Sequence, residues 1–178
     1  VVPNSNFEIA SRPAISISNP VIQQETCFGQ GNGGISISIG GGTGSLDVEW
    51  FVAGNFSTVI STNQNLINVG PGQYTVKVYD LGNNSCFVQE TFTIPPTPEL
   101  LLGLDGPPVN VLCFGESTGA INIAVSGGTG TYTYAWTGPS GFTSTQKNIN
   151  GLAAGLYNVT VTDANGCIKE LKDILVSQ

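Results

Sequence analysis

The sequence contains one segment twice, and this duplication is the feature that most limits what the chain can fold into. Residues 27–50 align without a gap with residues 113–136, and nearly half of the aligned positions are identical. After a short difference in length the match resumes, with residues 72–80 aligned to residues 155–163. Self-similarity over this distance indicates successive copies of one folded unit.

A proline-rich segment separates the two copies. Residues 95–98 read Pro-Pro-Thr-Pro, a composition typical of a stiff and extended spacer. We therefore expect a first repeat over residues 13–96 and a second repeat over residues 97–178. Residues 1–12 are predicted to be a linker or the tail of a preceding repeat. The chain reads as an excerpt from a longer protein, since it begins and ends within the repeat pattern.

Each repeat alternates apolar and polar residues with a period of two, which is typical of half-buried β-strands. The alternation is clearest at residues 35–39, 46–50 and 74–78, and it returns at the matching positions of the second repeat. Turns rich in glycine and asparagine separate these runs, as hairpins require. We predict an all-β fold of two tandem immunoglobulin-like β-sandwich domains with about seven strands each.

Four aromatic residues are expected to anchor the two cores: Trp50, Trp136, Tyr74 and Tyr157. The tryptophans lie on the predicted third strand, where such sandwiches bury one. The tyrosines begin the predicted sixth strand after a glycine, as in a tyrosine corner. Valine occupies the sixth-strand position at which these domains usually carry a cysteine, so we expect cores that packing alone holds together.

The second repeat resembles the SprB repeat. Between Cys113 and Cys167 it carries, in order, the elements Cys-x-Gly, Gly-x-Ile-x-Ile, Gly-Gly-Thr-Gly, Tyr-x-Trp and Gly-x-Tyr-x-Val-x-Val-x-Asp-Ala-Asn-Gly-Cys. The first repeat departs further from this pattern, for example at Val48, where the second repeat has Tyr134. The resemblance covers nearly all of both repeats.

This resemblance implies a location and a role. SprB repeats build very large filamentous adhesins on gliding Bacteroidetes, which the type IX secretion system exports, and they occur in other large surface proteins of that phylum. The resemblance thus implies an extracellular segment of an outer-membrane-associated surface adhesin, with neighbouring repeats of the same chain as its partners. An alternative is a carbohydrate-binding module that acts multivalently on surface polysaccharide, and a third possibility is an accessory module of a secreted enzyme.

Four cysteines in a secreted protein suggest two disulfides. One pairing lies within the repeats and joins Cys27 to Cys86 and Cys113 to Cys167. In a seven-strand sandwich, however, the turns after the first and sixth strands lie at opposite ends, because successive antiparallel strands alternate in direction. An eight-residue strand spans ~26 Å, whereas a disulfide needs Cα atoms within ~7 Å of each other.

The other pairing joins different repeats. In a head-to-tail array Cys27 would meet Cys167, while Cys86 would pair with the preceding repeat and Cys113 with the following one. This alternative depends on the number of strands. One strand fewer between the third and the sixth would reverse the parity and restore the pairing within each repeat. Both pairings therefore stay open at this point.

Composition narrows the classes of function. The net charge is −7, and the five Lys and Arg residues form no cluster, so we expect no binding to nucleic acid. No stretch approaches the ~18 apolar residues that cross a bilayer, and no signal peptide is recognisable, so we expect no direct insertion into a membrane. The chain has no histidine, which excludes Ser-His-Asp and Cys-His catalysis. We expect no enzyme, no catalytic site and no cofactor.

The remaining polar candidates are weak. Asp47 and Glu49 form a carboxylate pair on one strand, but Thr133 and Ala135 replace them in the second repeat. Oxygen ligands for Ca²⁺ are available at Asp80 with Asn83 and at Asp163 with Asn165, although hydrogen-bonded Asx turns explain both pairs better. We expect no metal site, and zinc in particular is not expected because the chain lacks histidine and Cys-x-x-Cys. The aromatic rings of Phe142 and Tyr132 are candidates for a sugar-binding face.

Overall fold

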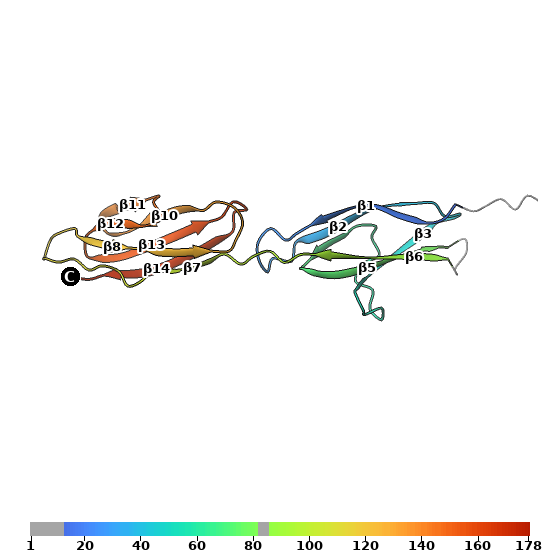
Figure 1. Cartoon of the computed structure of the whole chain (residues 1–178), viewed down its shortest axis with the longest axis horizontal. Coiled ribbons are helices and arrows are strands. Elements are labelled where there is room, and N and C mark those ends of the chain that lie inside the picture. Colours follow the sequence, from blue (N-terminus) through green and yellow to red (C-terminus); the bar gives the residue numbers. More distant parts are fainter. Residues whose placement is uncertain (1–12, 82–85) are drawn as a thin grey trace, which may run out of the picture. The chain divides into compact units, whose positions relative to one another are not determined.

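The computed structural model describes residues 13–81 and 86–178, and the fold is all-β (Figure 1). The chain forms two compact units. The first unit contains the described residues up to Glu25 together with Gly31–Pro96, and the second contains Thr26–Gln30 together with Thr97–Gln178. The predicted linker or tail at residues 1–12 lies outside the described residues. No helix in the described part of the chain is long and apolar enough to cross a membrane.

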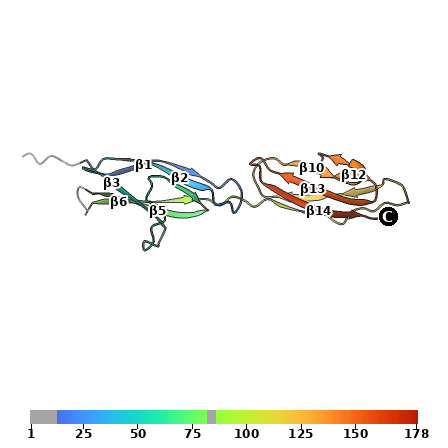
Figure 2. The same ribbon diagram turned by 180° about the vertical axis from the view of Figure 1, so that it is seen from behind.

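The first unit is a sandwich of two antiparallel three-stranded sheets. One sheet has the order β1 (Ser16–Gln23), β2 (Gly33–Gly40), β4 (Leu66–Val69). The other has the order β3 (Leu46–Val52), β5 (Gly72–Asp80), β6 (Phe87–Ile94). Figure 2 shows the same two layers from behind. The chain passes from one sheet to the other after β2, after β3 and after β4. This is the immunoglobulin-like order with one strand missing.

The second unit repeats this arrangement. One layer pairs β7 (Leu101–Leu104) with β9 (Ile123–Ser126) and β8 (Gly119–Ile121) with β12 (Ile149–Leu152). Since only Asn122 separates β8 from β9, the two correspond to β2 of the first unit. The other layer has the order β11 (Thr143–Ser144), β10 (Thr133–Thr137), β13 (Gly155–Thr162), β14 (Ile168–Val176). A short 3₁₀ turn, Pro139–Gly141, lies between β10 and β11.

A buried tryptophan lies at the centre of each core. Trp50 and Trp136 are both fully buried, and each packs among the inward-facing aliphatic residues of the two sheets. Each indole nitrogen also donates a hydrogen bond, from Trp50 Nε1 to the carbonyl oxygen of Asn63 at 3.0 Å and from Trp136 Nε1 to that of Gln146 at 2.9 Å. The ring therefore fills the core without leaving its polar atom unpaired.

Both tyrosines form the tyrosine corner. Tyr74 donates its hydroxyl to the carbonyl oxygen of Gly70 at 3.0 Å, and Tyr157 donates to Ala153 at 2.9 Å. Each bond reaches four residues back and fixes the turn that enters the strand. Burial raises the pKa of both tyrosines, so each hydroxyl remains a donor.

The described residues of the first unit form six strands, because the link between β3 and β4 contains none. Residues 53–65 contribute an isolated antiparallel bridge, in which Trp50 exchanges backbone hydrogen bonds with Ile60 and Ser61. Through this bridge the link runs back along β3, where a further strand was expected. Tyr74 consequently begins the fifth strand of its repeat and not the sixth.

Replacing Tyr157 by Phe removes one buried hydrogen bond without changing the shape of the ring. We expect the free energy of unfolding of the second unit to fall by about 1 kcal/mol, because the carbonyl of Ala153 loses its donor. Urea unfolding read by pulsed hydrogen–deuterium exchange and mass spectrometry reports on each unit separately. Tyr132→Phe is the matched control, since its hydroxyl bonds to Gly127 at an exposed site. An equal loss in both variants would contradict this role of the corner.

Candidate functional site

The described residues contain one disulfide, between Cys27 and Cys167, whose Cα atoms lie 5.6 Å apart. Cys27 lies in the turn after β1, and Cys167 directly precedes β14. Cys86 and Cys113 are exposed free thiols. Of the two pairings open from the sequence, the structure has the one that joins different repeats. The pairing within repeats, Cys27–Cys86 with Cys113–Cys167, is not formed.

The geometry of the first unit explains why Cys27 and Cys86 do not pair. The turn after β1 lies where β5 begins, since Gln23 is paired with Gly34 and Val69 with Gly33. Cys86 lies beyond the other end of β5, which has nine residues. That strand spans ~26 Å or more, much further than a disulfide reaches. The expectation that one strand fewer would restore this pairing was wrong, because the strandless link still carries the chain back along the sandwich.

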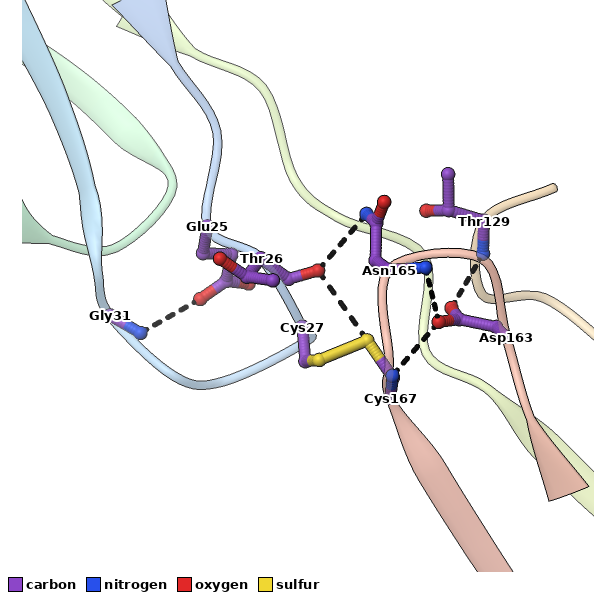
Figure 3. The surroundings of a disulfide bond; sticks show 8 residues. All are labelled: Glu25, Thr26, Cys27, Gly31, Thr129, Asp163, Asn165 and Cys167. Atoms are coloured by element: carbon purple, nitrogen blue, oxygen red, sulfur yellow. Dashed lines mark hydrogen bonds between the residues drawn. A yellow bond between two sulfur atoms is a disulfide. The ribbon is translucent and has the colours of Figure 1, made fainter.

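The turn that carries Cys27 is closed by its own hydrogen bonds. Gln30 donates its backbone N–H to the carbonyl oxygen of Cys27 at 3.1 Å, and Gly29 adopts the left-handed conformation that this turn requires. The buried carboxylate of Glu25 accepts a hydrogen bond from the backbone N–H of Gly31 at 3.0 Å (Figure 3). The segment Thr26–Gln30 is thus a formed turn, and it belongs to the second compact unit.

Asp163 holds the turn that presents Cys167. Its Oδ2 accepts the backbone N–H of Thr129 at 2.8 Å, and its Oδ1 accepts those of Asn165 and Cys167, both at 2.9 Å (Figure 3). Gly128 permits this approach, since a Cβ there would lie 2.7 Å from Asp163 Oδ2. One carboxylate therefore ties the glycine-rich turn before β10 to the turn that precedes β14.

The two turns also meet through polar atoms beside the disulfide. The side-chain amide of Asn165 donates to the carbonyl oxygen of Thr26 at 3.2 Å, and Cys167 Sγ lies 3.4 Å from the same oxygen (Figure 3). An adjacent hollow of about 340 Å³ is lined by residues that include Phe28, Leu100 and Lys169. Lys169 forms a half-exposed ion pair with Glu99 at 2.9 Å. Polar and apolar groups of the second compact unit thus surround the disulfide.

The hydrogen bonds to Asp163 determine its protonation. Burial raises the pKa of this carboxyl, but the backbone N–H groups of Cys167, Thr129, Asn165 and Gly166 outweigh that effect and hold the pKa below its ordinary value. Because these donors occupy the carboxylate, the Asx turn explains Asp163 and Asn165 better than a calcium site. Among the described residues, no group of three or more His, Cys, Asp and Glu lies close enough to hold a metal ion.

The corresponding aspartate of the first repeat makes a similar contact. Asp80 accepts hydrogen bonds from the backbone N–H and the hydroxyl of Thr43, at 2.7 and 2.8 Å. Asn83, its predicted companion, lies outside the described residues. Asp80 at the end of β5 and Asp163 directly after β13 thus have the same structural task in their repeats.

Asp47 and Glu49 lie on the outer face of β3. Together with Tyr79 and Leu81 they line a shallow hollow of about 240 Å³. Partial burial, followed by a hydrogen bond and charge repulsion from Glu49, raises the pKa of Tyr79. Glu49 thus has a neighbour that stays protonated and donates to it. This hollow is a polar surface beside a tyrosine. The residues that line it include no nucleophile, and no base other than the two carboxylates.

A cluster of aromatic rings around Lys77 was not expected from the sequence. Lys77 Nζ lies 4.3 Å from the ring centroid of Phe56, 5.5 Å from that of Phe51 and 5.6 Å from that of Phe87. Tyr79 adds a further ring, 5.8 Å from Phe87. The available signal was the presence of aromatic residues at positions that alternation assigns to the polar face of the sheet. Phe56 comes from the irregular link, where no periodicity predicts its neighbours.

The rings first considered for sugar binding have other roles. Phe142 packs edge-on against buried Tyr157, with centroids 5.4 Å apart, and is itself half-buried. Tyr132 packs against the same core and donates its hydroxyl to Gly127. Both rings therefore stabilise the second unit, and the exposed rings lie elsewhere, for example at Phe56 and Phe87.

Replacing Asp163 by Asn tests the role of this carboxylate. We expect the second unit to lose roughly 2 kcal/mol of unfolding free energy at neutral pH, because an amide cannot accept all of these N–H bonds. Since the pKa of Asp163 is lowered in the folded state, its contribution is complete above the ordinary carboxyl pKa and is lost as pH falls through the lowered value. The difference in unfolding free energy between wild type and variant should therefore become smaller at acidic pH.

The measurement is urea unfolding at neutral and acidic pH with a separate readout for each unit. Asp105→Asn is the matched control, because it removes the same charge from an exposed position of the same unit. We expect this control to unfold like wild type. If the difference in unfolding free energy between Asp163→Asn and wild type stays constant across the acid range, the charge of Asp163 does not contribute to stability.

Comparison with solved structures gives immunoglobulin-like and fibronectin-like proteins. The chain is similar to the eight N-terminal Ig domains of the Down syndrome cell adhesion molecule, with 13% identity, 93% of this chain and 25% of that chain covered, and a TM-score of 0.46. It is also similar to a C-terminal intimin fragment, with 17% identity, coverage of 90% and 64%, and a TM-score of 0.44. The fibronectin(III)-like modules of Clostridium thermocellum CbhA give 16%, 92% and 94%, and 0.33. The strand order and packing described above define the fold independently of these likenesses.

Two comparisons concern the sequence. The chain is 38% identical over 85 residues to a decoration protein of Escherichia phage T5, a match that covers 43% of this chain and 50% of that protein. The chain thus spans about half the length of this curated relative. Residues 106–141 match the family model described as SprB repeat. This match lies in the second repeat, where the residues of the pattern are best kept, and it confirms the resemblance of the chain to the SprB repeat family.

Proposed function

We propose that this chain is a structural segment of a large bacterial cell-surface adhesin, and that its tandem repeats extend the adhesin from the cell. The observation that carries the proposal is the Cys27–Cys167 disulfide, which links the sequence of the first repeat to the second repeat a second time. A structural repeat module accounts for the duplication and for the SprB match. Nothing in this role requires catalysis.

The second covalent link has a mechanical consequence. Domains joined by a single linker move relative to one another unless a large interface holds them. A disulfide between consecutive repeats restricts that motion and adds a bond that must break before the repeats can be pulled apart. An extended adhesin that carries force benefits from such a bond, because in an array each repeat interacts mainly with its neighbours.

The disulfide also supports the proposed location. Disulfides form and persist in oxidising compartments outside the cytosol. An extracellular protein associated with the outer membrane, exported by the type IX system as the SprB resemblance implies, meets this condition. Gliding motility is one setting in which an adhesin of this kind would act. The neighbouring repeats of the same long chain are the partners that this proposal requires.

Immunogold labelling of intact cells tests the location. An antibody raised against this chain should label the bacterium that encodes it outside the outer membrane, and external protease should remove the label. Labelling that appears only after the cells are permeabilised would contradict the proposal. An antibody against a cytosolic protein of the same cells controls for lysis.

The ring cluster around Lys77 favours a second candidate function, the binding of carbohydrate. Sugar-binding sites combine exposed aromatic rings with a few convergent polar groups. Phe56 and Phe87 are exposed, and Tyr79 stands beside the carboxylates of Asp47 and Glu49. The second repeat has no such group at the equivalents of Asp47 and Glu49, which are Thr133 and Ala135. A binding site here would therefore belong to the first repeat alone.

A glycan array with the whole chain separates the two functions. The structural role predicts no binding above background for wild type. The binding role predicts a signal that Phe87→Ala abolishes and that the matched control Phe114→Ala retains, since Phe114 is an equally large exposed ring in the other repeat. A signal with this pattern would replace the purely structural role by that of a carbohydrate-binding module whose site lies in the first repeat.

A further inference from the structure

We propose that the turn carrying Cys113 and the start of the last strand at Cys86 are the two open halves of the joint that Cys27 and Cys167 form, and that each binds and cross-links another repeat of the same kind. The turn at Cys113 receives the cysteine that precedes the last strand of one further repeat, and Cys86 receives the Cys113-type turn of another. This inference rests on the proposed function, since it explains how an array of such repeats is linked throughout.

The Cys113 turn has the conformation of the Cys27 turn. In both, the residue three positions later donates its backbone N–H to the carbonyl oxygen of the cysteine at 3.1 Å. In both, the sequence is Cys-Phe-Gly and the glycine has a positive φ, 78° at Gly29 and 83° at Gly115. The half of the joint that Cys27 contributes is therefore already formed at Cys113, without a bonded partner.

Cys86 is held at the start of its strand in the same way as Cys167. Asp80 donates its backbone N–H to the carbonyl oxygen of Cys86 at 3.1 Å, and Asp163 does the same to Cys167 at 3.0 Å. Each aspartate also accepts the backbone N–H of the threonine in the glycine-rich turn, as described above. Both cysteines directly precede the last strand of their repeat. The same scaffold thus presents a bonded sulfur in one repeat and a free thiol in the other.

Apolar surface accompanies the open half at Cys113. Phe114 is 91% exposed and Leu112 is 82% exposed. The equivalent ring in the formed joint, Phe28, is 57% exposed and lines the hollow beside the disulfide with Leu100 and Ile168. Exposed apolar side chains grouped beside a reactive group indicate a surface that a partner covers. The formed joint shows which partner fits, namely the turn before the last strand of a repeat.

The bond forms by thiol–disulfide exchange. The thiols of Cys86 in one chain and Cys113 in another each lose a proton, and one S–S bond forms between them. A small-molecule disulfide such as oxidised glutathione takes up the two electrons and two protons and leaves as two molecules of thiol. The first thiolate attacks this oxidant to give a mixed disulfide, and the second thiolate displaces the remaining glutathione.

Two single variants provide the test, because each keeps only one open half. Cys86→Ser retains the thiol of Cys113, and Cys113→Ser retains that of Cys86. In a buffer of reduced and oxidised glutathione, an equimolar mixture should form disulfide-linked dimers at least about tenfold more abundant than either variant alone, which is about 1.4 kcal/mol of preference. Mass spectrometry should find a Cys86–Cys113 peptide in the dimer, and an intact Cys27–Cys167 pair in every sample.

A second variant tests the surface apart from the thiols. Phe114→Ser added to Cys86→Ser should lower the dimer yield of the mixture, whereas Phe56→Ser in the same background should not. Equal dimer yields from the mixture and from the separate variants would overturn the inference, because random exchange needs no matching halves. Absence of dimers, or a wild-type monomer that closes Cys86 onto Cys113 within one chain, would overturn it too. The surface-labelling result is independent of all these outcomes, so the proposed function can stand or fall separately.

Discussion

The packing of Trp50 between two sheets determines more than the stability of the first repeat. The same residue exchanges backbone hydrogen bonds with Ile60 and Ser61, and its indole donates to Asn63. These bonds hold the irregular link beside β3 and return the chain to the end where β4 must begin. The turn after β1 and Cys86 therefore lie at opposite ends of the sandwich, and Cys27 is left without a partner in its own repeat.

Much of this fold could be predicted because each strand faces a core with every second residue. The alternation of apolar and polar residues located the strands, and the duplication indicated that both repeats have the same fold. The link of residues 53–65 escaped prediction, since Phe56, Val59 and Ile60 are apolar and yet exposed. The parity argument counted strands as the only segments that cross the sandwich. The inter-repeat pairing was predicted from the alternating directions of seven strands. The described residues of the first unit form six.

The candidate site was predictable where a short sequence determines a local conformation. Asp163 and Asn165 were expected to form an Asx turn, and the carboxylate binds the backbone in that way. The contacts of Lys77 could not be foreseen, because they bring together two strands and the irregular link. Contacts between side chains of different elements correspond to no regular spacing in the sequence. The contact of Phe142 with Tyr157 could not be foreseen for the same reason.

A repeat of this kind combines a core complete in itself with cysteine-bearing turns that are not. Each core consists of residues of one repeat, whereas Cys27 is bonded to Cys167 of the next repeat. The most direct measurement is a non-reducing peptide map of the native protein by mass spectrometry. The account predicts a peptide pair that joins Cys27 to Cys167. Peptide pairs joining Cys27 to Cys86 and Cys113 to Cys167 would contradict it, and the repeats would then be independent domains on a proline linker.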